Sequence, residues 1–204
     1  MMGHMENIEK KHIITIAGGP GSGKSTTAKA VAEKLGYDHF SSGDLFRAIM
    51  KDLGYDVLEG NKKAEERKDV DHLVDQRLQK IGAEEDNKVI DSRMAWHWIP
   101  GSYKVYLNLD LLAAAHRILG GEHDPNRLAH EKVQETPEEY ARDLQARLDS
   151  ETRRYEDLYQ ANPSDLSNYD LVIDSAENNI DQVVELVING FHKWLESSDR
   201  LGTR

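Results

Sequence analysis

The sequence predicts an α/β fold in which a five-stranded parallel sheet is flanked by helices. Short β-branched and apolar segments alternate with amphipathic helical patterns along the chain, and this alternation is typical of a parallel sheet covered on both faces. A length of 204 residues suits one compact domain with small inserts. A glycine-rich turn follows the first predicted strand directly and links it to the first predicted helix.

Five short segments are expected to form the strands. The clearest is the β-branched run 13–17, which ends at the Gly-Gly-Pro-Gly turn. The second is the weakest, and the third is a short buried pair of residues. In chain order, the four remaining segments are residues 37–40, 89–90, 103–109 and 171–173.

Two helices are well marked by the spacing of their apolar residues. From Ala28 to Leu35 these residues recur at i, i+3, i+4 and i+7, and Gly36 supplies a stop signal. The same one-sided pattern runs through residues 180–195. Both stripes are expected to pack in the core rather than to bind a ligand.

Two polar stretches rich in charge, roughly 51–86 and 119–162, interrupt the alternation of strands and helices. Both have helical patterns in places, and both lie between predicted strands. They are therefore expected to be excursions from the central sheet that can move. We expect residues 1–204 to form a single domain.

The composition narrows the function classes. A formal net charge of −11 argues against nucleic-acid binding, although local basic residues can still create a positive cleft for anionic substrates. The absence of cysteine excludes disulfides and thiolate metal sites. No apolar run approaches the roughly 18 residues that span a bilayer, and the polar N-terminus lacks the hydrophobic stretch of a signal peptide. We expect a cytoplasmic protein without nucleic-acid or membrane partners.

The loop Gly18–Ser25 matches the phosphate-binding pattern G-x-x-x-x-G-K-[ST], between a buried strand and an amphipathic helix. Its glycines let backbone N–H groups turn toward phosphates, and the following helix adds its positive end. Lys24 is expected to contact the β- and γ-phosphates of ATP, and Ser25 the Mg²⁺ ion that bridges them. The predicted triphosphate-binding residues are Gly18, Gly19, Pro20, Gly21, Ser22, Gly23, Lys24, Ser25 and Thr26.

Two other classes of P-loop protein are disfavoured. A GTPase carries an Asn-Lys-x-Asp element that reads the base, whereas the only near match, Asn61–Ala64, lacks the aspartate and follows no strand. In a typical ATPase, a glutamate that polarises water follows the acid at the end of the third strand. Here Asp91 is followed by Ser92. The site is therefore expected to transfer phosphate to an acceptor other than water.

Arginines outside the loop indicate what that acceptor carries. Guanidinium groups grip phosphate oxygens bidentately and stay charged, which suits a site that collects several phosphates. Arg47 and Arg93 follow predicted strands, and strand ends converge on the binding crevice of a parallel sheet. Arginines near Glu151 have the alternative of forming only surface ion pairs. The candidates are Arg47, Arg93, Arg147, Arg153 and Arg154.

These motifs, in this order, resemble those of the nucleoside-monophosphate kinases, and among them the cytidylate kinases of the short archaeal type. The resemblance runs from about Ile13 to the final helix. Besides the phosphate-binding loop, it rests on four segments: Ser41–Arg47, Val89–Arg93, Arg147-x-x-x-Glu151-x-x-Arg154 and Asp170–Ser175.

The resemblance implies a P-loop NTPase fold with a monophosphate-binding insert at about 44–87 and a lid at about 117–162. It implies that Ser25 and Asp91 serve the metal and that Arg47 and Arg93 hold the monophosphate. The implied substrate-binding residues are Ser42, Asp44, Arg47 and Arg93.

In the lid, the resemblance implies that Arg147 and Arg154 close over the phosphoryl group and that Arg117 stacks on adenine. The implied catalytic residues are Lys24, Asp91, Arg93, Arg147 and Arg154. The implied reaction is the transfer of phosphate from ATP, with Mg²⁺, to CMP or dCMP, by an enzyme that we expect to be a monomer.

Three departures leave the acceptor base open. Cytidylate kinases often carry Gly-Arg after the third strand, where this chain has Asp91-Ser92-Arg93, and position 151 is Glu where Asp is common. The aromatic run 96–98 could shape a base pocket or pack beneath the sheet edge. The alternatives are a kinase for AMP or another small acceptor, and a nucleotide-binding regulator without kinase turnover.

Overall fold

The computed structural model describes residues 9–54, 68–120 and 136–199. Its centre is a parallel sheet of five strands in the order β2-β3-β1-β4-β5, which confirms the predicted α/β class. All five predicted segments form strands, with bounds that differ by no more than one residue at either end. The strands are β1 (Ile13–Gly18), β2 (Asp38–Ser41), β3 (Lys88–Asp91), β4 (Tyr103–Asn108) and β5 (Leu171–Asp174).

The central strand β1 is buried along its whole length because it pairs with β3 on one side and β4 on the other. Strand β2 pairs with β3 so that Ser41 lies opposite Asp91. All pairs are parallel, so the carboxyl ends of the strands meet at one edge of the sheet. The loops after β1, β2 and β3 therefore converge there.

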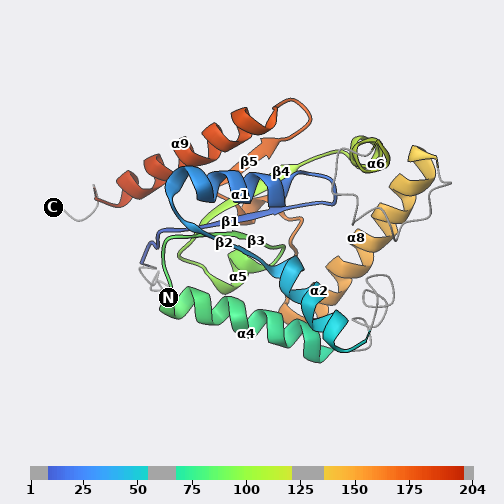
Figure 1. Ribbon diagram of the computed structural model, residues 1–204, viewed down its shortest axis with the longest axis horizontal. Helices are drawn as coiled ribbons and strands as arrows, with labels where there is room; N and C mark the ends of the chain where they lie inside the picture. Colours follow the sequence, from blue (N-terminus) through green and yellow to red (C-terminus); the bar gives the residue numbers. More distant parts are fainter. Residues whose placement is uncertain (1–8, 55–67, 121–135, 200–204) are drawn as a thin grey trace, which may run out of the picture.

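Helices cover both faces of the sheet (Figure 1). On one face lie α1 (Lys24–Leu35) and α9 (Ile180–Asp199), and on the other α4 (Lys68–Glu84) and the short α5 (Ala95–Trp98). The first pair packs in the larger core cluster, where Val31 and Phe191 meet strand residues. The second face has its own cluster, in which Leu78 and Ile81 meet Ile90. The apolar stripes of α1 and α9 are core, as expected.

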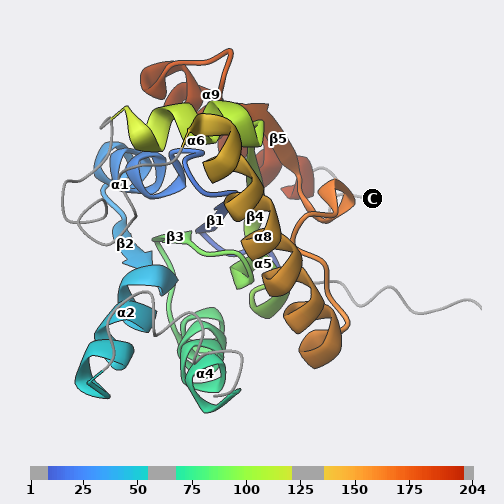
Figure 2. The same ribbon diagram turned by 90° about the vertical axis from the view of Figure 1, so that its right-hand side faces the viewer.

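Three further helices surround the carboxyl edge: α2 (Ser42–Asp52), α6 (Leu111–Leu119) and α8 (Pro137–Tyr159). Helix α8 begins with a capping box between Thr136 and Glu139 and with Pro137 in its first turn, which favours a helix start here. Its first half packs on α6 through Tyr140 and Leu144. Figure 2 shows α8 running from α6 past the sheet toward α5.

Helix α4 falls in the first predicted excursion and α8 in the second, whereas α2 ends where the first excursion begins. The assignment of 44–87 and 117–162 as inserts stays a prediction, and Asn61–Ala64 lies outside the described residues. A short 3₁₀ turn, Leu166–Asn168, leads into β5. Within the three described ranges, no helix combines the length and the apolar character needed to cross a membrane.

Candidate active site

The loop between β1 and α1 is shaped by glycine. At Gly18 an added Cβ would lie 2.6 Å from the carbonyl oxygen of Leu107, so only glycine lets β4 approach this closely. Gly23 is the N-cap of α1 with φ of 83°, in the left-handed region that favours glycine. No side chain caps the first turn of α1, so its N–H groups can bind an anion.

Side chains of the loop turn inward across it. Ser22 Oγ donates to the carbonyl of Gly19 at 2.9 Å, and Lys24 Nζ reaches the same carbonyl at 3.3 Å. Lys24 thus holds its charge over the loop, where the phosphates of a nucleotide would lie. Thr26 is exposed on the first turn of α1.

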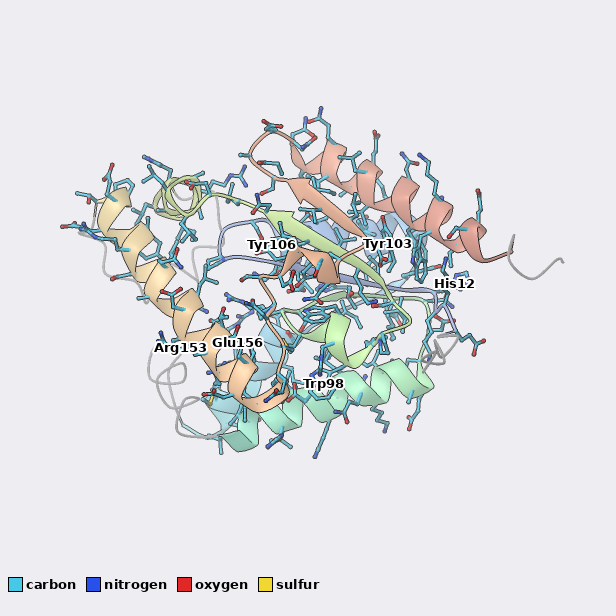
Figure 3. All side chains as sticks on the ribbon, turned by 180° about the vertical axis from the view of Figure 1, so that it is seen from behind. His12, Trp98, Tyr103, Tyr106, Arg153 and Glu156 are labelled. Carbon is cyan, nitrogen blue, oxygen red and sulfur yellow. The ribbon has the colours of Figure 1, made fainter. Side chains whose placement is uncertain are left out.

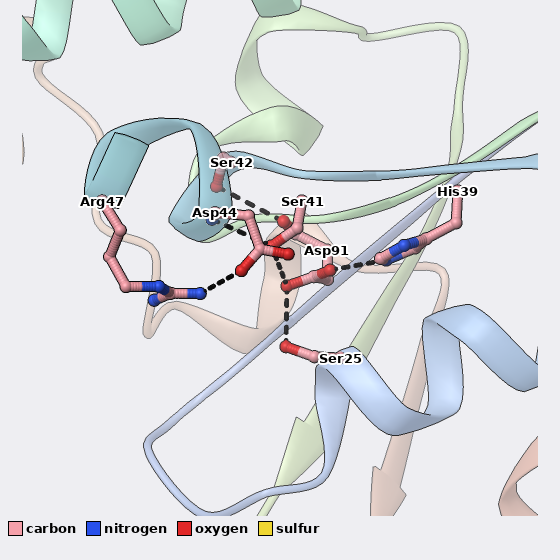
Figure 4. A network of polar contacts seen from close by, with 7 residues as sticks. All are labelled: Ser25, His39, Ser41, Ser42, Asp44, Arg47 and Asp91. Carbon is pink, nitrogen blue, oxygen red and sulfur yellow. Dashed lines mark hydrogen bonds and ion pairs between the residues drawn. The ribbon is translucent and has the colours of Figure 1, made fainter. Parts of the chain in front are cut away.

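Asp91, at the end of β3, is the centre of a polar network (Figure 4). Its side chain is buried, and its Oδ1 accepts hydrogen bonds from Ser25 Oγ at 2.9 Å and Ser41 Oγ at 3.1 Å. His39 Nε2 lies 2.8 Å from Oδ2. Burial alone would raise the pKa of Asp91, but the bonds from His39 and Ser25 and the charge of Lys24 outweigh it, so the pKa is lowered. Asp91 is therefore an ionised carboxylate at neutral pH.

The residues at this point suit Mg²⁺. The Ser25 hydroxyl and the Asp91 carboxylate are oxygen donors 2.9 Å apart, and Mg²⁺ takes few protein ligands, completing its shell with substrate phosphates and water. Among the described residues, no group of three or more His, Asp or Glu side chains could hold a metal. The oxygen donors of Ser25 and Asp91 fit an ion that also binds the phosphates of a nucleotide.

The predicted acceptor residues lie in the first turns of α2, beside Asp91. Ser41 is the N-cap, with its side chain accepting from the N–H of Asp44, and Ser42 Oγ donates to the Asp91 carbonyl at 3.3 Å. Arg47 forms an ion pair with Asp44, one turn back (Figure 4). The guanidinium of Arg47 is thus held at the edge of the site.

A second charged cluster joins α8 to the loop after β3. Glu151 forms ion pairs with Arg93 and, at 3.0 Å, with Arg147 Nε. Burial would raise the pKa of Glu151, but the charges of Arg93 and Arg147 outweigh it and lower that pKa. Two of the predicted catalytic arginines, Arg93 and Arg147, thus meet at one largely buried carboxylate.

One turn further along α8, Arg154 contacts the helix α4. Its Nε lies 3.3 Å from Oδ2 of Asp71, and both side chains are largely buried. Burial raises the pKa of Asp71 to about 6, although the charge of Arg154 opposes this effect. The neighbouring Arg153 is exposed (Figure 3). Of the two adjacent arginines, only Arg154 is largely buried, packed against α4.

The aromatic run after Arg93 packs rather than facing an open cavity. Trp98 belongs to the core cluster beneath the sheet, and its Nε1 donates to Asp75 on α4 at 2.9 Å. Tyr159 of α8 bonds to the other oxygen of Asp75. Trp96 Nε1 donates to the carbonyl of Arg93 at 2.9 Å. These bonds join α4, α5 and α8 next to the arginine cluster.

Arg117 lies on α6. Its Nη2 donates to the carbonyl of Ser175, just after β5, at 2.5 Å. This bond holds the guanidinium near the carboxyl end of β5. Adenine stacking by Arg117 stays a prediction.

A small pocket between the loop and α8 brings the two halves of the site together. Gly18 and Gly19 line it from the loop, and Arg93 lines it from the end of β3. Several of its residues were not singled out from the sequence, because they lie on α8, on β4 or in the loop before β5. The other lining residues are Ala17, Tyr106, Leu148, Thr152, Pro163 and Ser164.

His39, Asp71 and Asp75 were also missed from the sequence. His39 and Ser41 lie two apart on a strand and so share a face, but that pattern points to Asp91 only once β2 is known to adjoin β3. Asp71 and Asp75 lie four apart on a helix, a spacing that is common on solvated faces. Nothing in their spacing distinguishes them from exposed charges.

Comparisons with known proteins identify relatives of this chain. A family model described as "AAA domain" matches residues 17–119. The cytidylate kinase of Haloarcula marismortui is 36% identical over 190 residues, covering 92% of this chain and 93% of that protein. The cytidylate kinase of Methanocaldococcus jannaschii is 34% identical over 180 residues, covering 86% and 94%.

Solved structures share the fold at lower identity. A gluconokinase from Sinorhizobium meliloti superposes with a TM-score of 0.58 at 17% identity, over 96% of this chain and 99% of that one. A shikimate kinase from Bacteroides thetaiotaomicron gives 0.57 at 18% identity, over 90% and 98%. At these identities the likeness concerns the fold alone, and it confirms the predicted P-loop NTPase fold. The relatives matched over most of both chains show that this chain belongs to the cytidylate kinase family of nucleoside-monophosphate kinases.

Proposed function

We propose that this chain transfers the γ-phosphoryl group of ATP to CMP or dCMP, giving ADP and CDP or dCDP. One observation carries the proposal: the phosphate-binding loop and Arg93 line the same pocket. A donor phosphate on the loop would therefore lie next to an arginine suited to an acceptor phosphate. The relatives that match over most of their length are cytidylate kinases, which supports cytidine as the acceptor nucleoside.

The reaction requires the protein to align the two phosphates and to neutralise their charges. An oxygen of the acceptor phosphate forms a bond to the γ-phosphorus while the bond from that phosphorus to the β-phosphate oxygen breaks, and ADP leaves. The attacking oxygen needs no strong base, so alignment and charge supply most of the rate gain. Mg²⁺, held by Ser25 and Asp91, would neutralise charge on the β- and γ-phosphates. Lys24 would bind the same oxygens from the loop.

The arginines would bind the phosphate of the acceptor and the γ-phosphoryl group during its transfer. In the structure Arg47 pairs with Asp44, while Arg93 and Arg147 pair with Glu151. Each guanidinium has further donors beyond those used for one carboxylate. We expect phosphate oxygens to take these donors, with the carboxylates keeping the guanidinium planes in place. Arg154 would close on the γ-phosphoryl group from α8.

Three finer statements belong to the same proposal. Small nucleotides are the partners, because the acidic chain lacks the overall basic footprint of a nucleic-acid-binding protein. Segments 44–87 and 117–162 act as the monophosphate-binding insert and the lid. The enzyme acts as a monomer in the cytoplasm, and Mg²⁺ is its metal.

The proposal is tested with a panel of acceptors, using ATP, Mg²⁺ and coupled detection of ADP. We expect CMP and dCMP to give the highest kcat/KM, ahead of UMP, AMP, shikimate and gluconate. A best acceptor other than CMP or dCMP would overturn the cytidine assignment and keep the kinase class. Tight ATP binding without transfer to any acceptor would instead make the chain a regulator. Lys24→Ala is the control, and it should abolish the signal.

A further inference from the structure

His39 occupies a position that the proposed chemistry has not used. Its Nε2 is 2.8 Å from Asp91 Oδ2, the oxygen that the two serines leave open. The side chain of His39 is 19% exposed and that of Asp91 is 4% exposed, so the contact lies largely out of solvent. A hydrogen bond to a buried, charged acceptor contributes more free energy than an ion pair on the surface.

The strand register brings these side chains together. In the pairing of β2 with β3, His39 lies opposite Val89 and Ser41 opposite Asp91. Alternate residues of a strand share a face, so His39, Ser41 and Asp91 lie on the face of the sheet that α1 covers. Val89, which shares that face, packs in the core cluster with α1 residues. Ser25, in the first turn of α1, approaches the carboxylate from this same side.

The three side chains contact different oxygens of the Asp91 carboxylate. Oδ1 accepts from Ser25 and Ser41, and Oδ2 takes the bond with His39 (Figure 4). The terminal torsion of an aspartate is broad, so the bonds to its two oxygens decide the orientation of the carboxylate. The hydroxyl donors hold Oδ1, and the contact with His39 on Oδ2 narrows the torsion further from the opposite side. The Ser25 hydroxyl then donates its hydrogen bond to Oδ1 and keeps an oxygen lone pair for a metal.

We propose that His39 is a positioning residue for the metal site, which fixes the rotation of Asp91 so that Ser25 presents its oxygen to Mg²⁺. The inference rests on the proposed use of ATP with Mg²⁺. A carboxylate oxygen accepts hydrogen bonds, so Nε2 of His39 is the donor in this contact.

The test measures metal binding directly, without turnover. Mn²⁺ replaces Mg²⁺, and electron paramagnetic resonance titrates free Mn²⁺ against the full chain saturated with a non-hydrolysable ATP analogue. Calorimetry gives the affinity of the analogue without metal. The variants are His39→Leu, which removes the donor, His39→Asn, whose amide is too short to reach Oδ2, and His39→Gln, which can place a donor near Nε2.

We expect His39→Leu and His39→Asn to weaken Mn²⁺ binding to the complex by about 10- to 100-fold, the usual cost of losing a residue that orients a metal ligand. The Mn²⁺ affinity of His39→Gln should stay within about 3-fold of wild type, because glutamine keeps a donor for Oδ2. In all three variants the affinity for the metal-free analogue should change less than about 2-fold, because the phosphate-binding loop is unchanged.

His12→Leu is the matched control. His12 also makes a hydrogen bond, with the Tyr37 hydroxyl at 3.0 Å, but it lies at the end of the sheet away from α8 (Figure 3). The Mn²⁺ affinity of the His12→Leu variant should equal that of wild type.

Two results would overturn the role of His39 alone: wild-type Mn²⁺ affinity in both donor-free variants, or an equal loss of metal-free and metal-dependent affinity. If His39→Leu does not fold, His39→Asn and His39→Gln decide the question between them. If the wild-type complex holds no Mn²⁺, the proposed metal use fails as well, and this inference fails with it.

Discussion

At the scale of single residues, the arginines that would handle phosphates are held by carboxylates. Arg47 pairs with Asp44, Arg93 and Arg147 share Glu151, and Arg154 pairs with Asp71. Each pair keeps a guanidinium in place, and in the largely buried pairs of Arg93 and Arg154 the cost of burying one charge is offset by the other. The roles of these arginines can be separated by substitution, since Arg47 lies on α2, Arg93 follows β3, and Arg147 and Arg154 lie two turns apart on α8 with different carboxylate partners.

Arg47→Ala tests the acceptor side of the site. We expect the KM for CMP to rise about 10-fold or more, because one charged contact to the acceptor phosphate is worth about 1.5–3 kcal/mol. The KM for ATP should change less than about 2-fold, since Arg47 lies on α2 and not on the phosphate-binding loop. Steady-state kinetics with both substrates varied decide this, and an equal rise in both KM values would contradict it.

Asp71 should leave a signature in the pH dependence of stability. Its pKa is about 6 in the folded protein, above the ordinary value of about 3.9 for an unfolded chain. A raised folded pKa means that the contribution of Asp71 to stability is complete below about pH 4 and is lost as pH rises through about 6. Arg154 and His72 oppose this rise in pKa, while Asp75 and Glu151 add to it.

In Asp71→Asn this pH-dependent loss disappears. The stability of the variant relative to wild type should therefore grow by up to about 3 kcal/mol between about pH 4 and pH 7, whatever constant offset the lost ion pair adds. Urea unfolding across this range measures the difference. Asp157→Asn, an exposed position on α8, is the control and should run parallel to wild type. Parallel curves for Asp71→Asn would contradict the shifted pKa.

At the scale of elements, α8 connects three parts of the molecule. Its first half packs on α6, its middle carries Glu151 against Arg93, and its last turns reach α4 and α5 through Arg154 and Tyr159. A single helix therefore links the phosphate-binding edge to the proposed monophosphate-binding helices.

The two faces of α8 give a sharp comparison between adjacent arginines. Arg154→Ala should lower kcat by about 100-fold or more, because it removes a charge that would stabilise the transferring phosphoryl group. Arg153→Ala removes an exposed arginine one position away and should change kcat less than about 3-fold. Single-turnover rates with ATP and CMP measure both variants. Similar losses in the two variants would contradict the assignment of the inner face.

Local signals explain how much of these elements could be predicted. β-branched runs and glycine stops are properties of neighbouring residues, so each strand was predicted to within one residue at either end. The predicted apolar stripes of the first and last helices lie inside α1 and α9. The phosphate-binding loop is equally local. The bond between His39 and Asp91 depends on β2 lying next to β3, and the burial of Glu151 and Asp71 depends on how α8 packs on α4. Such contacts between distant segments have no signature in a single sequence.

At the scale of the whole molecule, an acidic chain places several basic side chains at one edge of a parallel sheet. The formal net charge is −11, yet Lys24, Arg93 and Arg147 lie around the carboxyl ends of the strands. Such a local field can attract nucleotides while the rest of the surface repels polyanions. The fold brings these charges together from segments that lie far apart in the chain.

The central claim is that this edge moves phosphate from one nucleotide to another and not to water. The direct measurement follows ³²P from γ-labelled ATP in the presence of Mg²⁺ and CMP, with products separated by chromatography. The account predicts that the label appears in CDP, with little inorganic phosphate, because the site holds an acceptor arginine and has no glutamate after Asp91. Label released mainly as inorganic phosphate, with CMP unchanged, would contradict it.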